Sequence, residues 1–395
     1  MKLLVVSHPC VVDTNQAFYS EVERLTGWSL TLVVPTRWNS EYGPLQPQRW
    51  PTLQGDLLPL PVIASGHISW HVYRARFGAL LRWMRPDAIY MHHEPYALAT
   101  QQVYLANQMI TRVPIGCYAA QNIYKRYPMP LVALERWVLR RTAFAFPVSA
   151  EAEAVIRRKG YQGVAPVLPL ALDTTVYRPQ PDKAALLRGE LGVNSQTPVI
   201  GYVGRLVEEK GLLTLLDALG ELTDLDWQLV LIGEGPQKQE LRTHAHDLGL
   251  DQRITFVGYV PHGLIASYLS FFDVLVLPSL TRPHWKEQFG RVLIEAMACE
   301  TPVLGSDSGE IPALIGTTGG GEIAPEGDVG AWALALRRLL LDPAHRANLA
   351  RVGCQRVRER YGQEALASRF AETVERAVPQ SGGIIPKASA KVGGG

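Results

Sequence analysis

The amino-acid sequence predicts an α/β protein with two doubly wound, Rossmann-like domains that face each other across a cleft. Its 395 residues are too many for one ordinary domain and suit two domains of about 200 residues each. Strand-like and helix-like segments alternate over residues 2–160, and a second alternation begins near residue 198. Such alternation is typical of a parallel sheet covered on both faces by helices.

The first half contains short apolar runs, each followed by an amphipathic segment. We expect strands at residues 2–8, 29–35, 87–93, 114–120 and 143–149. We expect helices at residues 15–27, 71–86, 130–142 and 150–160. A region rich in Trp and Pro, residues 38–61, is expected to be irregular.

The second half repeats this pattern after a loose segment, residues 173–197, that we interpret as a connection between domains. We expect strands at residues 198–204, 227–233, 254–260, 274–279 and 302–307. We expect helices at residues 211–222, 236–249, 264–271 and 290–299, followed by helices to about residue 378.

These patterns divide the chain into four parts. The expected parts are a first domain at 1–173, a second domain at 174–362, a C-terminal helix at 363–379 and a tail at 380–395. The helix can return to the first domain. The tail is rich in Gly, Ser and Lys with little to bury, so we expect it to be disordered.

Composition narrows the functional classes. Hydrophobic residues make up 47% of the chain and charged residues 19%, which is typical of an ordered globular protein. Residues 1–175 hold 17 Lys and Arg against 11 Asp and Glu, which suits an anionic partner but is too weak to indicate nucleic acid. No apolar run approaches the roughly 20 residues of a membrane span, so we expect a cytoplasmic protein. The four cysteines are far apart, without CxxC pairs, and predict no zinc site.

Two acids bracket the stretch EQFGRVLIE, residues 287–295. Glu287 lies on the loop before an expected helix, Gly290 opens that helix, and Glu295 lies in its second turn. Helix N-termini favour phosphate, and glycine permits close approach. The two carboxylates could therefore hold hydroxyl groups on either side of a diphosphate. The simpler alternative is that Glu287 only complements the helix dipole.

Two cations follow another expected strand in the stretch GYVGRLVEEKG. Arg205 and Lys210 lie in the loop at the carboxyl end of the strand, where ligands bind in sheets of this kind. By itself a Lys such as Lys210, beside two glutamates, is more often a solvated charge. Because both loops leave strand ends of one sheet, the two stretches together indicate an anionic ligand.

These stretches, with LVLIGEGPQKQEL, ITFVGYV and LPLALDTTVYRP, resemble the donor-binding domain of family-4 glycosyltransferases, which are retaining, nucleotide-sugar-dependent enzymes with the GT-B fold. The resemblance is close over residues 165–330 and looser before them. It implies that Arg205 and Lys210 bind the donor diphosphate and stabilise the leaving group, in place of a metal. It implies that Glu295 holds the ribose and that Glu287 contacts the transferred sugar.

The resemblance also implies a wider donor site. Backbone groups around Phe289 and Gly290, with Leu293, would contact the donor. The residues that would line the nucleotide base are Gly233, Gly258 and Tyr259. In the first half, DAIYMHHEP resembles a strand that ends in a functional histidine. The sequence allows either His92 or His93, and the HEP tripeptide favours His93, as a group that binds the sugar or positions the acceptor.

The sequence departs from the family pattern in two places. The loop after the first strand, residues 7–18, lacks the usual Gly-Gly pair, which leaves open how ligands are placed from that side. After residues 303–309, Glu310 and Ala313 stand where the family shows Gly-Gly-x-Pro-Glu. The segment Asp224–Asp226 imitates an Asp-x-Asp metal motif, but it precedes a strand, at the end of the sheet opposite to ligand sites. We therefore predict no metal there.

The predicted function is transfer of a sugar from a UDP- or GDP-sugar to a hydroxyl group of a saccharide or lipid-linked acceptor, in polysaccharide or glycolipid biosynthesis, with retention and without a metal or other cofactor. The alternatives are a sugar-nucleotide epimerase of the same architecture and a non-catalytic nucleotide-sugar-binding partner. Two basic, aromatic segments, residues 73–85 and 124–141, could contact an anionic membrane surface, or could pack on the sheet with their arginines outward.

Overall fold

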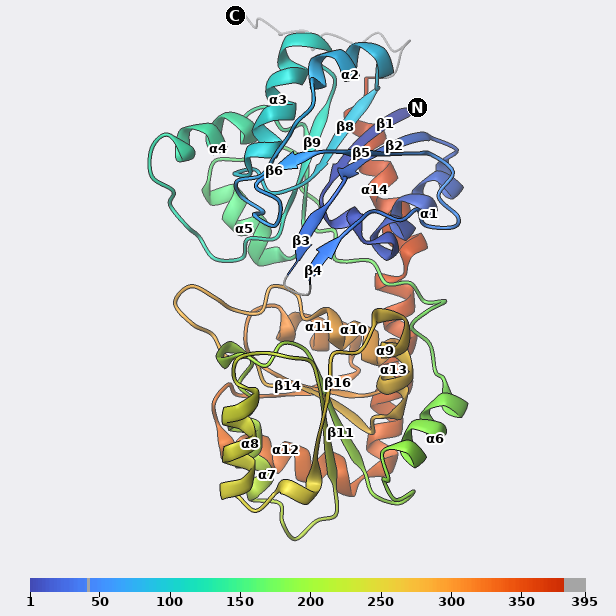
Figure 1. Ribbon diagram of the computed structural model, residues 1–395, viewed down its shortest axis with the longest axis vertical. Helices are drawn as coiled ribbons and strands as arrows, with labels where there is room; N and C mark the ends of the chain where they lie inside the picture. The colour runs from blue at the N-terminus through green and yellow to red at the C-terminus, as the bar shows by residue number, and fades with distance from the viewer. Residues whose placement is uncertain (41–42, 380–395) are drawn as a thin grey trace, which may run out of the picture.

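The computed structural model describes residues 1–40 and 43–379 (Figure 1). It contains two six-stranded parallel sheets, which lie one above the other along the long axis of the molecule. The prediction of two doubly wound α/β domains is confirmed. The tail expected to be disordered, residues 380–395, lies outside the described residues.

The first sheet has the strand order β10-β9-β8-β1-β2-β5. Its strands are β1 (Lys2–Ser7), β2 (Ser29–Pro35), β5 (Asp56–Leu60), β8 (Ala88–His92), β9 (Ile115–Ala119) and β10 (Phe144–Pro147). Its helices are α1 (Ala17–Thr26), α2 (Phe77–Met84), α3 (Leu98–Ile110), α4 (Leu131–Leu139) and α5 (Ala150–Arg158). Two small antiparallel pairs accompany the sheet: β3 (Trp38–Ser40) with β4 (Gly43–Leu45), and β6 (Val62–Ile63) with β7 (Val72–Tyr73).

Residues of β1 show why helices cover both faces of this sheet. Leu3 and Val5 belong to one apolar cluster, and Leu4 and Val6 belong to another. Successive side chains of a strand point to opposite faces, so a continuous apolar run must be buried on both sides. Helix α1 covers one face, and helices α2 and α3 cover the other.

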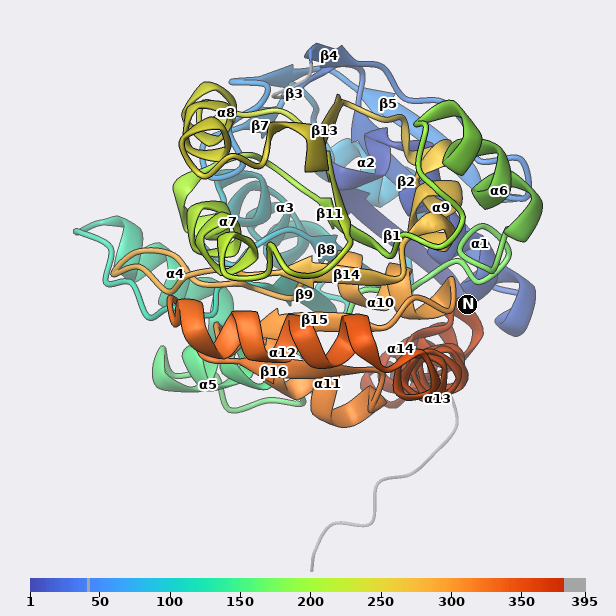
Figure 2. The ribbon, with the colours of Figure 1, turned by 90° about the horizontal axis from the view of Figure 1, so that it is seen from below.

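The second sheet has the order β13-β12-β11-β14-β15-β16. Its strands are β11 (Val199–Val203), β12 (Gln228–Ile232), β13 (Ile254–Gly258), β14 (Val274–Leu277), β15 (Val303–Ser306) and β16 (Gly321–Ala324). The helices of this half are α6 (Pro181–Glu190), α7 (Leu212–Gly220), α8 (Lys238–Asp247), α9 (His262–Phe271), α10 (Arg291–Ala298), α11 (Ile311–Thr318), α12 (Val329–Leu341) and α13 (Pro343–Tyr361). Helices α7, α8 and α12 form one layer, and α9, α10 and α13 form the other (Figure 2).

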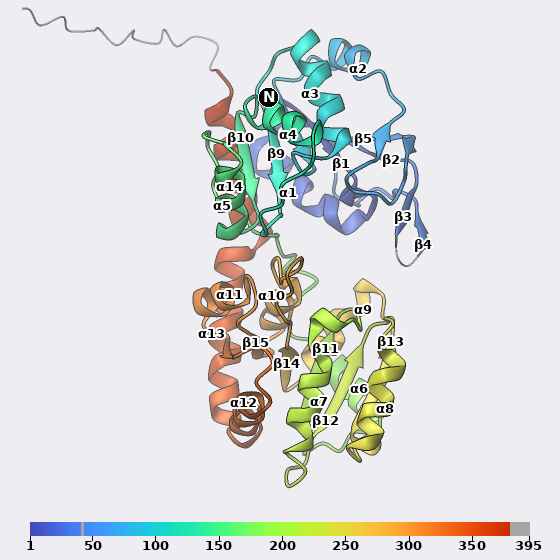
Figure 3. The same ribbon diagram turned by 90° about the vertical axis from the view of Figure 1, so that its left-hand side faces the viewer.

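The chain crosses between the sheets twice, at neighbouring places. The backbone N–H of Leu172 donates to Tyr361 O at 2.8 Å, and the N–H of Gln363 donates to Leu172 O at 3.2 Å. The last helix, α14 (Gln363–Ala377), then packs against α1 of the first sheet (Figure 3). The two C-terminal helices α13 and α14 therefore run along both halves of the molecule.

Expectations about three elements were wrong, and helix α6 lies in the segment 173–197 that was interpreted as a loose connection. The helix expected at residues 71–86 begins only at Phe77, because Val72 and Tyr73 pair with β6. Strand β5 lies in the region expected to be irregular, and β16 lies where only helices were expected. Both are edge strands. Pro59 in β5 and Gly321 in β16 weaken the strand signal, and such residues are tolerated at a sheet edge.

Candidate active site

The second sheet reverses its direction of winding between β11 and β14. Strand β11 leads outward through α7 to β12, and β14 leads through α10 to β15 on its other side. Ligands in doubly wound sheets bind beyond the carboxyl ends of the strands at such a switch point. The loops at residues 204–211 and 278–290 leave these two strands and meet there, as the sequence predicts.

Lys210 and Glu287 form the centre of this meeting point. Lys210 Nζ lies 2.5 Å from Glu287 Oε2, and the Ser279 hydroxyl donates to the same oxygen at 2.9 Å. The ammonium group also lies 4.9 Å from the ring centroid of Trp285. The side chains of Lys210 and Glu287 are only 13% and 11% exposed, so the pair is largely removed from water.

The backbone of Glu287 is held as firmly as its carboxylate. Its carbonyl oxygen accepts hydrogen bonds from the Glu310 N–H at 3.2 Å and from Asn122 Nδ2, which belongs to the first half of the chain, at 3.0 Å. Gly309 has φ +55°, and a Cβ atom there would lie 1.9 Å from this carbonyl oxygen. Only glycine fits at position 309 without moving the loop that carries Glu287.

Helix α10 begins where the sequence predicts. Gly290 stands at its N-cap with φ +74°, a conformation that favours glycine. Phe289 and Leu293 are 4% and 0% exposed, so their side chains belong to the core. Any contact they make with a ligand must come from the backbone.

Glu295 is a buried acid with two neighbours. Arg291 Nε lies 2.9 Å from Glu295 Oε1, although the N–H of Nε does not form a hydrogen bond of good geometry. The hydroxyl of Tyr177 also interacts with this carboxylate. The pKa of Tyr177 is raised, mainly by burial and then by the negative charge of Glu295. Glu295 thus has both a charge partner and a hydroxyl group as neighbours.

The remaining predicted donor residues lie along the adjoining strand ends. Arg205 lies 3.5 Å from Glu209 and is 40% exposed at its side chain. A Cβ atom at Gly233 would lie 1.9 Å from Gly204 O, and the Gly233 N–H donates to Gly258 O at 2.8 Å. These glycines therefore allow three loops to lie side by side. Tyr259, which follows Gly258, is 55% exposed.

The two histidines at the end of β8 point to different surroundings. His92 Nδ1 forms hydrogen bonds with Tyr19 Oη at 3.0 Å and with Ser7 Oγ at 3.2 Å. Burial lowers the pKa of His92 to about 4. His92 lines a cavity between the two halves of the chain, and His93 is not among the residues that line it. His93 is 1% exposed and contacts His71 and the backbone of Val6.

The cavity beside His92 has a volume of about 390 Å³. Arg291 and Tyr177, the neighbours of Glu295, form part of its wall. Asp173 is the one acid among the described residues that line it. Most of the wall is aromatic or aliphatic, and its aromatic members on the first half of the chain include Phe18, Tyr19, Trp50, Tyr90, Tyr118 and Phe146.

Several of these neighbours carry no signal in the sequence. Ser279, Trp285 and Tyr177 lie in loops or connections whose contacts depend on the folded chain, and Asn122 reaches the site from the other domain. The segment Asp224–Asp226 has local partners. Asp224 makes a bidentate pair with Arg337 at 2.7 Å, and Asp226 accepts from Thr197 at 2.6 Å.

A protein-family match covers part of the second half of the chain. Residues 184–356 match the family described as glycosyl transferases group 1. The chain is 30% identical over 254 residues to 2-deoxystreptamine glucosyltransferase of Streptomyces kanamyceticus, covering 63% of this chain and 64% of that protein. It is 31% identical over 209 residues to a GDP-mannose-dependent phosphatidylinositol monomannoside mannosyltransferase of Mycolicibacterium smegmatis, covering 52% and 54%. The chain thus spans less than two thirds of the length of these relatives.

Solved structures extend the likeness to both domains. Sucrose-phosphate synthase of Thermosynechococcus elongatus superposes with a TM-score of 0.73 at 22% identity, covering 95% of this chain and 98% of that chain. HepE of Anabaena in complex with UDP has a TM-score of 0.73 at 17% identity, covering 95% and 100%. At these identities the likeness shows the fold. Residues 184–356 therefore resemble the group 1 glycosyl transferases, and the chain as a whole has the GT-B fold.

Proposed function

We propose that this protein is a retaining glycosyltransferase of the family-4 kind, which transfers a sugar from a UDP- or GDP-sugar to a hydroxyl group of an acceptor without a metal ion. The observation that carries the proposal is the Lys210–Glu287 pair at the strand switch point of the second sheet. It brings a cation for a diphosphate and a carboxylate for sugar hydroxyls to the start of one helix.

The donor would rearrange this pair. A diphosphate at the N-terminus of α10 would attract Lys210 and Arg205, and would leave the Glu287 carboxylate, still bonded to Ser279, to accept hydroxyl groups of the sugar. The two cations stabilise the nucleoside diphosphate as its bond to the sugar breaks. Glu295, with Tyr177 beside it, would hold the ribose. We propose front-face attack by the acceptor hydroxyl, which gives retention without a covalent enzyme intermediate.

Thermal unfolding in the presence of UDP, GDP, ADP and their sugar conjugates tests donor binding. A ligand that binds only the native state raises Tm. We expect one nucleotide family to raise it, with and without EDTA, and Lys210→Gln to abolish the shift. Lys238→Gln is the matched control, because Lys238 at the start of α8 pairs with Glu234 of the preceding loop and not with Glu287. A shift that needs a divalent metal, or that persists in Lys210→Gln, would contradict the proposed site.

Product analysis separates the proposal from its alternatives. With donor and no acceptor, an epimerase would convert the nucleotide-sugar to an isomer, whereas a transferase would leave it intact or hydrolyse it slowly. A binding partner would raise Tm and yield no product with any acceptor. NMR of the transferred sugar reports its anomeric configuration, and inversion would refute the retaining mechanism.

We propose that the acceptor has an apolar part and binds in the cavity beside His92. The wall of the cavity is mainly aromatic and aliphatic, and its charged groups, Asp173 and Arg291, are of opposite sign. A dicationic aminocyclitol such as 2-deoxystreptamine would need carboxylates in place of this apolar wall. A glycolipid or another saccharide with an apolar substituent matches the wall better.

Tryptophan fluorescence tests this assignment, because Trp50 lines the cavity. We expect octyl glucoside, below its micellar concentration, to change the emission of the wild-type protein saturably, and 2-deoxystreptamine to leave it unchanged. Trp50→Phe should lose most of the change while keeping the fold. An equal response to the aminocyclitol would refute an apolar acceptor.

We also propose peripheral contact with an anionic membrane, through the surface around α2. Trp83 is 77% exposed and is flanked by Arg82 and Arg85. Exposed Trp beside Arg suits the boundary between lipid headgroups and acyl chains. Co-sedimentation with phosphatidylglycerol vesicles should fall with salt and with Trp83→Ser. Equal binding to neutral vesicles would contradict the electrostatic part. Within residues 1–40 and 43–379, no helix is long and apolar enough to cross a bilayer.

A further inference from the structure

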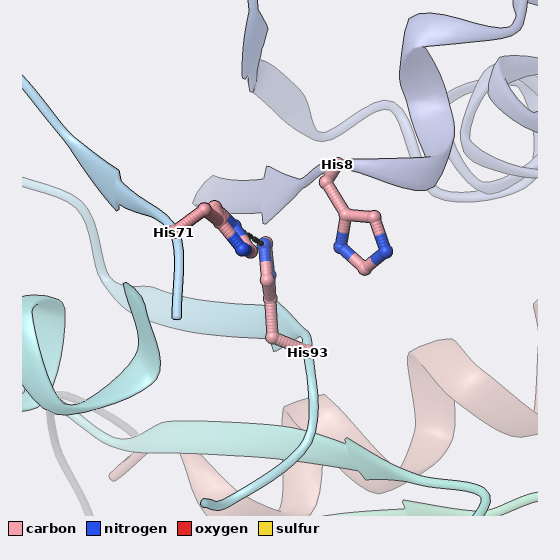
Figure 4. A group of neighbouring side chains, drawn as sticks. All are labelled: His8, His71 and His93. Carbon is pink, nitrogen blue, oxygen red and sulfur yellow. Dashed lines mark hydrogen bonds between the residues drawn. The ribbon is translucent and has the colours of Figure 1, made fainter. Parts of the chain in front are cut away.

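Three histidines from distant parts of the first half meet in one cluster, which we call the His8–His71–His93 cluster (Figure 4). His8 follows β1, His71 precedes β7 and His93 follows β8. One ring nitrogen of each lies within 4.8 Å of those of the other two. The closest pair, His71 Nε2 and His93 Nε2, is 3.1 Å apart.

The backbone fixes the tautomers of the two closest rings. His71 Nδ1 lies 3.0 Å from His67 O and 3.1 Å from Ile68 O, and His93 Nδ1 lies 3.0 Å from Val6 O. A carbonyl oxygen can only accept a hydrogen bond, so each Nδ1 carries the hydrogen. In the neutral rings both Nε2 atoms are then acceptors, and they face each other at 3.1 Å. Two lone pairs at this distance repel each other unless a cation lies between them.

His8 supplies a third nitrogen with nothing to bind. Its Nδ1 atom is buried and has no hydrogen-bond partner. In Figure 4 the Nδ1 edge of the ring faces His71 and His93. A buried polar nitrogen without a partner is uncommon and needs a ligand or another explanation. The nitrogens of His8, His71 and His93 therefore surround a place that suits a cation.

We propose that the His8–His71–His93 cluster binds one transition-metal ion of the zinc type. Zinc lies about 2.0–2.1 Å from each histidine nitrogen, so tetrahedral ligands stand about 3.3 Å apart, close to the 3.1 Å between His71 and His93. The three nitrogens lie within 4.8 Å of one another, so the rings would draw closer when the ion binds. Three imidazoles select zinc, copper or nickel over magnesium or calcium. The carbonyl groups that hold Nδ1 of His71 and His93 are the outer partners that orient metal-binding histidines.

The ion has a structural role in this proposal. It ties the segment before β7 to the carboxyl ends of β1 and β8, where the first sheet has its own switch point. Trp38 packs on the cluster, with its ring centroid 4.8 Å from that of His8 and 5.0 Å from that of His71. The side-chain contacts given above for Lys210 and Glu287 include none of the three histidines, so sugar transfer can remain independent of metal.

Metal uptake by the tag-free, EDTA-treated protein tests the proposal. Titration with Co²⁺ should produce visible absorption bands of tetrahedral cobalt that saturate at one ion per chain, and Zn²⁺ should displace them. His71→Gln and His8→Asn should each weaken binding by more than about 10- to 100-fold, the loss that follows from changing even an outer partner of a ligand. His67→Ala, which keeps the backbone carbonyl and removes an exposed imidazole, should bind as the wild-type protein does.

The wild-type measurement decides the matter even if a variant fails to fold. Circular dichroism reports the fold of each variant, and His8→Asn changes the least buried member of the cluster. Absence of stoichiometric Co²⁺ and Zn²⁺ binding by the wild-type protein would overturn the proposal and leave a shared proton between His71 and His93. Equal loss of binding in His67→Ala would overturn it as well, because the metal would then lie at the surface.

Discussion

At the scale of single residues, Glu287 is the position where contacts from both domains converge. Its carboxylate contacts Lys210 and Ser279, and its carbonyl oxygen contacts Asn122. We expect Glu287→Gln to lower kcat about 100-fold or more, because a preorganised electrostatic contact at the transferred sugar is lost. Nucleotide binding, measured by the rise in Tm, should persist because Lys210 remains.

Glu208→Gln is the control for that variant. Glu208 is exposed and pairs with Arg282 at 2.8 Å. The substitution therefore removes one acid near the site and leaves the Lys210–Glu287 pair intact. Steady-state kinetics with a fixed donor measure both variants. Turnover of Glu287→Gln within about threefold of wild type would mean that Glu287 has only the helix-dipole role that the sequence also allowed.

A second residue-scale prediction concerns Glu94, which directly follows His93. Burial raises its pKa from 4.5 to about 7, against the opposing pull of the Ala120 N–H and Lys159, and Glu135 raises it further. When the pKa of a carboxyl group is higher in the folded state than in the unfolded state, the free energy of unfolding falls as pH rises. For Glu94 it falls by up to about 3 kcal/mol between pH 4.5 and about 7. Glu94→Gln should therefore match wild type at pH 5 and have the higher Tm at pH 8. The same Tm difference at both values would refute this linkage.

The sequence predicted where the loops of the second sheet meet better than it predicted which histidine faces the cavity. Glu287, Gly290, Arg205 and Lys210 follow strands that the apolar pattern marks clearly, so their meeting at one sheet edge could be expected. His92 and His93 are adjacent on a strand end, and successive residues point to opposite sides. The choice between them depends on whether a ring meets the cavity or His71, and residues that distant in the sequence leave no local pattern.

At the scale of elements, α14 is the helix that joins the end of the chain to the first core. Phe370 is 0% exposed, and its ring lies 4.9 Å from Phe146 and 5.1 Å from Tyr90. Phe370→Ala should lower the free energy of unfolding by about 3–5 kcal/mol, the cost of a large core cavity. Arg376→Ala on the exposed face of α14 should change it by less than about 0.5 kcal/mol.

Calorimetry shows which domain the Phe370→Ala substitution destabilises. Because α14 packs on α1, the transition of the first domain should move to lower temperature in Phe370→Ala. If only the unfolding transition of the second domain moved to lower temperature, α14 would act as an extension of α13 instead. The sequence indicates an amphipathic helix here, but periodicity alone does not say which of two apolar cores receives it.

Two of the four edge strands of the main sheets, β5 and β16, were not predicted by the pattern. Central strands such as β1 and β11 are buried on both faces and show as uninterrupted apolar runs. Strands β5 and β16 pair with one neighbour each, and exposed or half-buried positions interrupt them. Their pairing depends on a neighbouring strand far along the chain, so a window of local sequence carries little of the signal.

At the scale of the whole molecule, two switch points face each other. The first sheet has its switch between β1 and β8, and the second between β11 and β14. Each places its ligand-binding loops at the carboxyl ends of its strands, and Asn122 connects the two by its bond to Glu287 O. An acceptor bound at one sheet and a donor bound at the other would meet only when the domains are close, so closure belongs to the proposed mechanism.

The closing contact that can be tested is the ion pair between Lys286 and Glu151, which joins the two halves beside Asn122. The side chains are 21% and 37% exposed, so the pair contributes no more than about 1 kcal/mol and shifts the closed population by at most about fivefold. Lys286→Gln should therefore enlarge the radius of gyration measured by X-ray scattering at low salt. High salt should bring the wild-type protein toward the same value, because salt screens partly exposed charges.

Lys238→Gln, whose pair lies within the second domain, should leave the radius unchanged. A radius that responds to neither Lys286→Gln nor salt would mean that apolar contacts and the Asn122 bond set the domain distance, and that the donor meets a site already closed.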